Sequence, residues 1–140
     1  MFREVQILVI GDLMLDKYIG GIVERISPEA PCPVFSKKSV TNQLGGAANV
    51  AAQLKLLGAN VILAGCIAND EAGKTLIDIV KDRHISTELI SIDKTKTTVK
   101  NRFIANTHQQ VLRLDDEQIE NGSTEFYENL YSYIKEHKSD

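Results

Sequence analysis

Two adjacent glycines lead into a run of small and apolar residues at positions 45–58. Gly45-Gly46 suits a sharp turn, because glycine adopts backbone conformations that other residues avoid. The larger apolar residues after it recur at helical spacing and are Val50, Leu54 and Leu57. Gly58 stands where a helix end favours a residue that tolerates positive φ. The pattern therefore predicts a tight turn into a buried helix.

Asn49 falls in or near the first turn of this predicted helix. The free backbone N–H groups of a helix N-terminus favour polar or anionic oxygens, and glycines let a ligand approach the backbone closely. A tight loop before a well-packed helix explains the same residues without a ligand, and short glycine motifs have many false positives. Both interpretations stay open from this stretch alone.

Three apolar runs rich in β-branched residues predict buried strands, at residues 5–10, 60–67 and 87–92. The glycine-led helix separates the first two. A second helical stretch, with Asp70 as its N-cap, separates the second and third. The order strand, helix, strand, helix, strand predicts an α/β protein with a parallel sheet. A further amphipathic helix is expected over 123–137, with Ser123 as its N-cap.

Asp12 and Asp16 follow the first predicted strand. We expect both carboxylates just beyond the carboxyl end of that strand, where ligands of open α/β sheets bind. Asp12 can equally serve loop hydrogen bonds, which aspartate makes readily. Asp16 has apolar neighbours and is the stronger functional candidate.

The chain between positions 18 and 40 has a different character. Residues 18–26 show weak strand character that Gly20-Gly21 breaks. Residues 27–34 hold all three prolines and predict a stiff, irregular connector before a short strand. Later, residues 97–105 and 109–114 alternate in polarity and predict a hairpin with one polar face.

The predicted hairpin carries several cations. Arg102, together with Lys100 or Arg113, is a candidate for binding a phosphate, since the planar donors of arginine suit phosphate oxygens. A solvated face with scattered charges explains these residues nearly as well. The acidic run at 115–117 is expected to be a solvated turn rather than a metal site.

Composition limits the remaining possibilities. At 140 residues, with a net charge of −3, the chain is expected to be one soluble domain with no nucleic-acid or membrane partner. The opening apolar run is too short for a signal peptide or a membrane span. Two cysteines without a C-x-x-C pair favour reduced thiols in the cytoplasm, and the three histidines share no metal-ligand spacing. We expect no metal site in the chain.

Taken together, these residues resemble the ribokinase (PfkB-type) family of sugar kinases. Gly45-Gly46-Ala47-Ala48-Asn49, with Gly58 at the right spacing, matches the family's first signature, and Asp16 matches its strand-end aspartate. The stretch from Gly65 to Gly73 matches a later signature, except that Ala68 replaces a usual glycine. Within the family, the combination GDLMLDKY, RISPEAPCPV, LGGAANVAAQL and QQVLRLD resembles kinases of D-glycero-β-D-manno-heptose 7-phosphate, over about residues 5–116.

The resemblance implies a Rossmann-like parallel core with a small β lid, here residues 18–40 and 97–114. It implies that Gly45 and Gly46 form the hinge beneath the lid, and that Asp16 and Asn49 hold sugar hydroxyls. With Arg102 on the phosphate, these are the expected substrate-binding residues. The reaction implied is transfer of phosphate from ATP, with Mg²⁺, to the anomeric position. It serves ADP-heptose synthesis for lipopolysaccharide, in many bacteria within a protein fused to an adenylyltransferase.

One family motif is missing from the sequence. The Gly-Ala-Gly-Asp stretch, which in the family supplies the catalytic base and an anion hole beside the ATP pocket, does not occur. We therefore expect residues 1–140 to be the N-terminal part of such a kinase, without catalytic residues and inactive alone. The alternative is a noncatalytic sugar-phosphate-binding or dimerisation module. Both allow a homodimer through the lid or an exposed sheet edge.

Overall fold

The computed structural model describes residues 5–106 and 108–137. Its core is a three-stranded parallel sheet of β1 (Gln6–Ile10), β4 (Asn60–Ala68) and β5 (Ser86–Lys94), in the order β1-β4-β5. The three apolar runs are therefore strands at their predicted positions. This confirms the α/β class and the parallel core.

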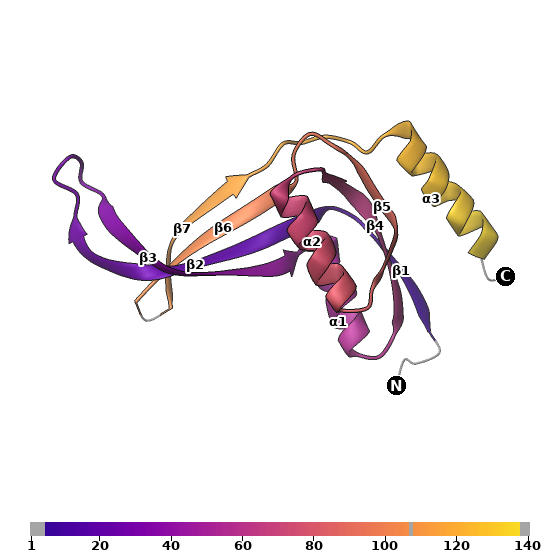
Figure 1. Cartoon of the computed structure of the whole chain (residues 1–140), viewed down its shortest axis with the longest axis horizontal. Helices are drawn as coiled ribbons and strands as arrows, with labels where there is room; N and C mark the ends of the chain where they lie inside the picture. The colour runs from indigo at the N-terminus through magenta and orange to yellow at the C-terminus, as the bar shows by residue number, and fades with distance from the viewer. Residues whose placement is uncertain (1–4, 107, 138–140) are drawn as a thin grey trace.

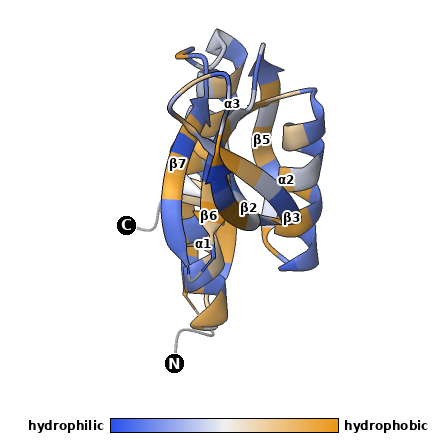
Figure 2. Cartoon of the chain, turned by 90° about the vertical axis from the view of Figure 1, so that its left-hand side faces the viewer, coloured by the Kyte–Doolittle hydropathy of each residue, from blue (hydrophilic) through white to orange (hydrophobic). Residues whose placement is uncertain are grey.

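A second sheet has four strands in the order β3-β2-β6-β7: β2 (Leu13–Ile26), β3 (Pro33–Gly45), β6 (Thr98–Ala105) and β7 (Gln109–Asp116). β2 pairs with β6 in parallel, while β3 and β7 lie antiparallel on the two outer sides. Figure 1 shows this sheet extending away from the helices, with the β2–β3 connection at its far tip. Hydrophilic and hydrophobic stretches alternate along β7 (Figure 2). The predicted hairpin over β6 and β7 is confirmed.

β2 is one long strand, so the predicted break at Gly20-Gly21 is wrong. The two glycines lie at a register shift between β2 and β3. A Cβ on Gly20 would come within 2.4 Å of the Ser39 Oγ, and one on Gly21 within 2.4 Å of the Phe35 ring. Here glycine makes room for side chains of the neighbouring strand, and the strand continues through it. β3 is also longer than predicted, because it includes Pro33 and runs to Gly45.

β2 starts before residue 18, where strand character was predicted, so the predicted position of Asp16 just beyond the first strand is wrong. The strand begins at Leu13, so Asp16 lies inside β2, whereas Asp12 lies in the connection after β1. Burial explains the early start, because Leu13 and Leu15 are each 1% exposed and belong to the main core. The acidic run at 115–117 needs a similar correction, since Asp115 and Asp116 end strand β7 instead of forming a turn.

Helix α1 (Gly46–Leu56) confirms the predicted turn and helix. Gly46 has a φ of +54°, and Gly58, after the helix, has a φ of +92°. The buried face differs from the predicted apolar stripe, because Val50 and Leu57 are 51% and 57% exposed. The residues of α1 that are buried are small: Ala48, Ala51 and Ala52. Alanine allows the helix to pack closely against the sheets.

The other two helices begin at the predicted caps. The Asp70 side chain accepts a hydrogen bond from the Gly73 N–H at the start of α2 (Glu71–Asp82). The Ser123 Oγ accepts one from the Phe126 N–H at the start of α3 (Thr124–His137). Phe126 and Leu130 of the predicted stripe are buried, whereas Ile134 is 41% exposed. None of the described helices has the length and apolar character needed to cross a membrane.

Two apolar clusters lie on opposite faces of the parallel sheet. Side chains alternate along β4, so that Leu63 joins the main core, whereas Ala64 and Cys66 pack with Phe126 and Leu130 of α3. The main core also contains residues from the first residues of β2, from α1 and from α2. It therefore binds the second sheet firmly to the parallel one, and Figure 1 shows α3 apart from α1 and α2.

Candidate functional site

An ion pair joins the predicted sugar-binding aspartate to the predicted phosphate-binding arginine. Nη1 of Arg102 lies 2.6 Å from Oδ1 of Asp16. The parallel register of β2 and β6 sets Asp16 beside Lys100, and Tyr18 beside Arg102. Alternate residues of a strand share one face, so these four side chains project from the same face of the sheet. The Arg102 guanidinium also lies 5.4 Å from the centre of the Tyr18 ring.

The pair is partly shielded from solvent. The Arg102 and Asp16 side chains are only 21% and 17% exposed. The hydrogen bond and the charge of Asp16 raise the pKa of Arg102, although burial acts in the opposite direction. A partly buried ion pair is screened less by solvent than the exposed ion pairs of a protein surface. Asp16 is therefore held in a defined position.

Gly45, the first of the two glycines, lies against the same carboxylate. Gly45 ends β3 and pairs with Met14 of β2, and a Cβ on Gly45 would lie 3.0 Å from the Asp16 Cγ. A Cβ on Gly46 would lie 2.4 Å from the backbone oxygen of Asp12. Only glycine allows the turn from β3 into α1 to pass this close to the start of β2.

Asn49 lies further along α1 and does not share this contact. It is exposed, and its Oδ1 accepts a hydrogen bond from the Gln53 side chain at 3.5 Å. Asn49 is three residues after Gly46, so the two are neighbours on one face of the helix. The structure thus brings Asp16, Gly45 and Arg102 together. Gly46 and Asn49 lie on the first turn of α1, which follows Gly45 directly.

The other cations of the hairpin each have an acidic partner. Nζ of Lys100 lies 3.5 Å from Oδ2 of Asp115, and Nε of Arg113 lies 2.9 Å from Oδ1 of the same residue. Arg102 and Arg113 are opposite each other in the ladder between β6 and β7, where like charges repel. Asp16 and Asp115 neutralise this repulsion from either side. The cations could be predicted from the sequence, but their acidic partner Asp115 could not, because the pairing depends on the register of the strands.

The buried hydrogen bonds between Asp70, Thr97 and Ala68 were only partly predicted from the sequence. Asp70 caps α2, but its Oδ2 also accepts a hydrogen bond from the Thr97 N–H at 2.9 Å. Thr97 is 1% exposed, and its Oγ1 accepts a hydrogen bond from the Ala68 N–H at 2.9 Å. These bonds join the end of β4, the start of α2 and the residue before β6. A cavity of about 220 Å³ lies beside this junction, between α2 and the second sheet.

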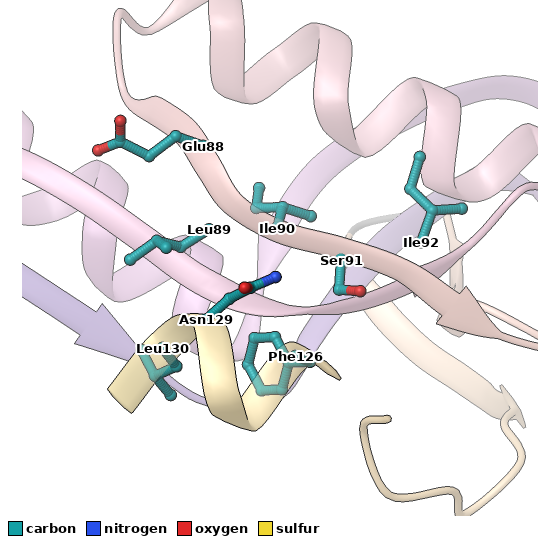
Figure 3. Close-up of a pocket in the computed structure, with 8 residues that line it drawn as sticks. All are labelled: Glu88, Leu89, Ile90, Ser91, Ile92, Phe126, Asn129 and Leu130. Carbon is teal, nitrogen blue, oxygen red and sulfur yellow. The ribbon is translucent and has the colours of Figure 1, made fainter. Parts of the chain in front are cut away.

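A cavity of about 250 Å³ lies elsewhere, between β5 and α3. Figure 3 shows Phe126 and Leu130 of α3 facing Leu89 and Ser91 of β5 across it. Its lining is mostly apolar and contains no cation, so it lacks the charged groups that gather around Asp16. It is therefore the weaker candidate for a substrate site.

Comparison with known proteins identifies the family to which this arrangement belongs. The sequence profile described as "pfkB family carbohydrate kinase" matches residues 5–138. The chain belongs to this family. This confirms the family resemblance that the motifs indicated.

Among curated relatives, the pfkB-family chain is 46% identical to the bifunctional protein HldE of Helicobacter pylori (strain J99) over 132 residues. The match covers 94% of this chain and 28% of that protein, so the chain spans little more than a quarter of the length of this relative. A carbohydrate kinase from Agrobacterium tumefaciens has a similar fold, with a TM-score of 0.63 and 21% identity over 80% of this chain and 35% of that one. Arabidopsis thaliana ribokinase, solved with ribose and ATP, has a TM-score of 0.62 and 19% identity over 83% of this chain and 36% of that one. These structures confirm the ribokinase-like fold.

Proposed function

We propose that the chain forms the sugar-binding and lid part of a kinase that phosphorylates D-glycero-β-D-manno-heptose 7-phosphate at the anomeric position, for ADP-heptose and lipopolysaccharide core synthesis. Family membership supports a carbohydrate kinase, and the identity to HldE supports a heptose substrate. The observation that carries the proposal is the Asp16 carboxylate, which contacts Arg102 and lies beside Gly45 at the end of β3.

In this proposal, Asp16 accepts hydrogen bonds from sugar hydroxyls. A carboxylate is an acceptor with two oxygens, and bonds to it are among the stronger hydrogen bonds. Gly45 and Gly46 allow the sugar to approach the backbone, and Asn49 adds an amide on the first turn of α1. Arg102 is the last of the proposed substrate-binding residues, because its guanidinium contacts Asp16 directly.

We propose that the second sheet is a lid over the sugar. It projects from the core, and its inner end is fixed by the Asp70–Thr97 junction. Closure of such an element excludes water from the reacting groups, which in a kinase limits wasteful hydrolysis of the nucleotide. The outer edges of β3 and β7 have no strand partner among the described residues. We propose that a homodimer forms through this sheet or through an edge of the parallel sheet.

ATP and Mg²⁺ are the co-reactants that this proposal requires. The Arabidopsis ribokinase with ribose and ATP supports ATP as the donor. Within residues 5–106 and 108–137, no group of three or more His, Cys, Asp or Glu residues could hold a metal ion. We propose that the chain binds sugar phosphate without transferring phosphate, because no Gly-Ala-Gly-Asp stretch occurs in it.

Chemical-shift mapping by NMR tests the proposed site. Heptose 7-phosphate added to ¹⁵N-labelled chain is expected to shift the amide signals of Gly45, Gly46 and Asn49 in a saturable way. The amides that line the cavity between β5 and α3, such as those of Leu89 and Asn129, serve as the internal control. Saturable shifts at that cavity, with none at the glycine pair, would overturn the proposed site.

A further inference from the structure

Arg102 is held on two sides by residues of β2. Its Nη1 lies against Oδ1 of Asp16, and its guanidinium lies over the ring of Tyr18, which is its neighbour in the strand register. Arginine stacks on aromatic faces and also pairs with carboxylates, so both contacts use its guanidinium at once. A side chain held in this way has little freedom left to reach a ligand.

We propose that Arg102 is a positioning residue that acts on the sugar through Asp16 and does not itself hold the substrate phosphate. This inference rests on the proposed function of Asp16. By contacting Oδ1, Arg102 restrains the Asp16 side chain and leaves Oδ2 for a sugar hydroxyl. Oδ1 is also the oxygen that a Cβ on Gly45 would approach to 3.1 Å, so the glycine and the arginine hold the same side of the carboxylate.

The burial of the two arginines on this face supports a division of roles. The Arg102 side chain is 21% exposed, whereas the Arg113 side chain, opposite it in the ladder, is 52% exposed. For Arg102 to bind a phosphate, it would have to leave Asp16, and a partly buried carboxylate would lose its partner. Such a loss is costly, because a poorly solvated charge is left without compensation.

A double-mutant cycle on sugar affinity tests the inference. Isothermal titration calorimetry on the chain would compare heptose 7-phosphate with unphosphorylated heptose, using wild type, Arg102→Gln, Asp16→Ala and the double variant. If Arg102 acts through Asp16, Arg102→Gln weakens both sugars by a similar factor, on the order of tenfold. In the Asp16→Ala background, the same substitution changes either affinity less than about twofold, because coupled residues are not additive.

Two further variants control for charge and folding. Arg102→Lys keeps a cation beside Asp16 without the planar donors, and we expect it to restore part of the affinity for both sugars. Arg83→Gln removes an exposed arginine at the end of α2 and is the matched control for net charge. Circular dichroism would verify that each variant keeps the wild-type spectrum.

The outcomes separate the inference from the function on which it rests. If Arg102→Gln weakens only the phosphorylated sugar, Arg102 binds the phosphate and the inference is wrong. If the loss is equal with and without Asp16, Arg102 does not act through Asp16 and the inference is also wrong. If wild type binds neither sugar, the proposed function fails, and the inference fails with it. Equal loss for both sugars that disappears in the Asp16→Ala background supports the positioning role.

Discussion

Thr97 and Asp70 are joined by a hydrogen bond of 2.9 Å from the Thr97 N–H to the Asp70 carboxylate, and this bond connects the two sheets of the molecule. The other oxygen of Asp70 caps α2. A single carboxylate therefore fixes both the start of a core helix and the residue that precedes strand β6. The candidate site depends on this junction, because β6 carries Arg102.

Replacing Asp70 should destabilise the fold. Asp70→Ala removes a helix cap and leaves the buried Thr97 N–H without its acceptor, at a cost of about 2 kcal/mol in the free energy of unfolding. Urea unfolding followed by circular dichroism measures this cost. Asp78→Ala, at an exposed position of the same helix, is the control and should cost less than about 0.5 kcal/mol. An equal effect of the two substitutions would contradict the role of the junction.

The contribution of Asp70 should also depend on pH. Burial favours a higher pKa for this carboxyl, but hydrogen bonds from Thr97 and Gly73 outweigh it and lower the pKa below its ordinary value. The folded state thus binds the proton less readily than the unfolded state, so the stabilisation is complete above about pH 5 and declines below about pH 4. The stability difference between wild type and Asp70→Ala should shrink in acid. A difference that stays constant down to pH 3 would be evidence against these bonds.

Gly46 and Gly58, which both have a positive φ, should differ in their tolerance of alanine. Gly58→Ala places a side chain at a φ of +92°, and this backbone strain costs about 1–2 kcal/mol in the free energy of unfolding. Gly46→Ala adds a collision with the Asp12 backbone oxygen, at 2.4 Å, and should cost at least about 1 kcal/mol more. Thermal and urea unfolding of both variants would measure the difference. Equal costs would show that the turn from β3 into α1 has room that the structure does not indicate.

The two cysteines should react very differently with a thiol reagent. Cys32 is exposed, whereas Cys66 is buried. Burial, followed by a hydrogen bond to Asp93, raises the pKa of Cys66 to about 12, so little thiolate exists at neutral pH. Ellman's reagent at pH 8 should modify one thiol rapidly in native protein and both after denaturation. Cys32→Ser should abolish the rapid phase, and rapid modification of that variant would contradict the burial of Cys66.

Features set by local chemistry could be predicted from the sequence. The caps Asp70 and Ser123, the glycine turn into α1 and the three core strands depend on neighbouring residues, and all are present. The buried face of α1 could not be predicted in the same way. Its alanines are buried because a sheet packs close to them, and the larger Val50 is left exposed.

The candidate site was predictable residue by residue but not as an arrangement. Asp16 and Arg102 were each identified from the sequence, yet their contact depends on the parallel pairing of β2 and β6, which are far apart in the chain. The same limit applies to Asp115, whose partners lie across a strand ladder. Gly20 and Gly21 misled the prediction, because their role is to make room for β3 rather than to end β2.

The proposal that the chain binds sugar phosphate without transferring phosphate has a direct assay. A coupled assay for ADP release, with ATP, Mg²⁺ and heptose 7-phosphate, should give no signal above the rate without sugar. Full-length Helicobacter pylori HldE, under the same conditions, is the comparison. Sugar-dependent ADP release by the chain would show that it contains a complete catalytic site.

The affinity of the chain for heptose 7-phosphate, measured by isothermal titration calorimetry with wild type and Asp16→Ala, tests the central claim most directly. Losing charge-assisted bonds to sugar hydroxyls should weaken binding by about 1.5–3 kcal/mol, which is at least tenfold. Asp12→Ala is the matched control. The Asp12 side chain is 86% exposed, and its ion pair with Lys94 is long, at 4.0 Å. The account predicts a large loss for Asp16→Ala and wild-type affinity for Asp12→Ala. Wild-type affinity in a folded Asp16→Ala variant would contradict it.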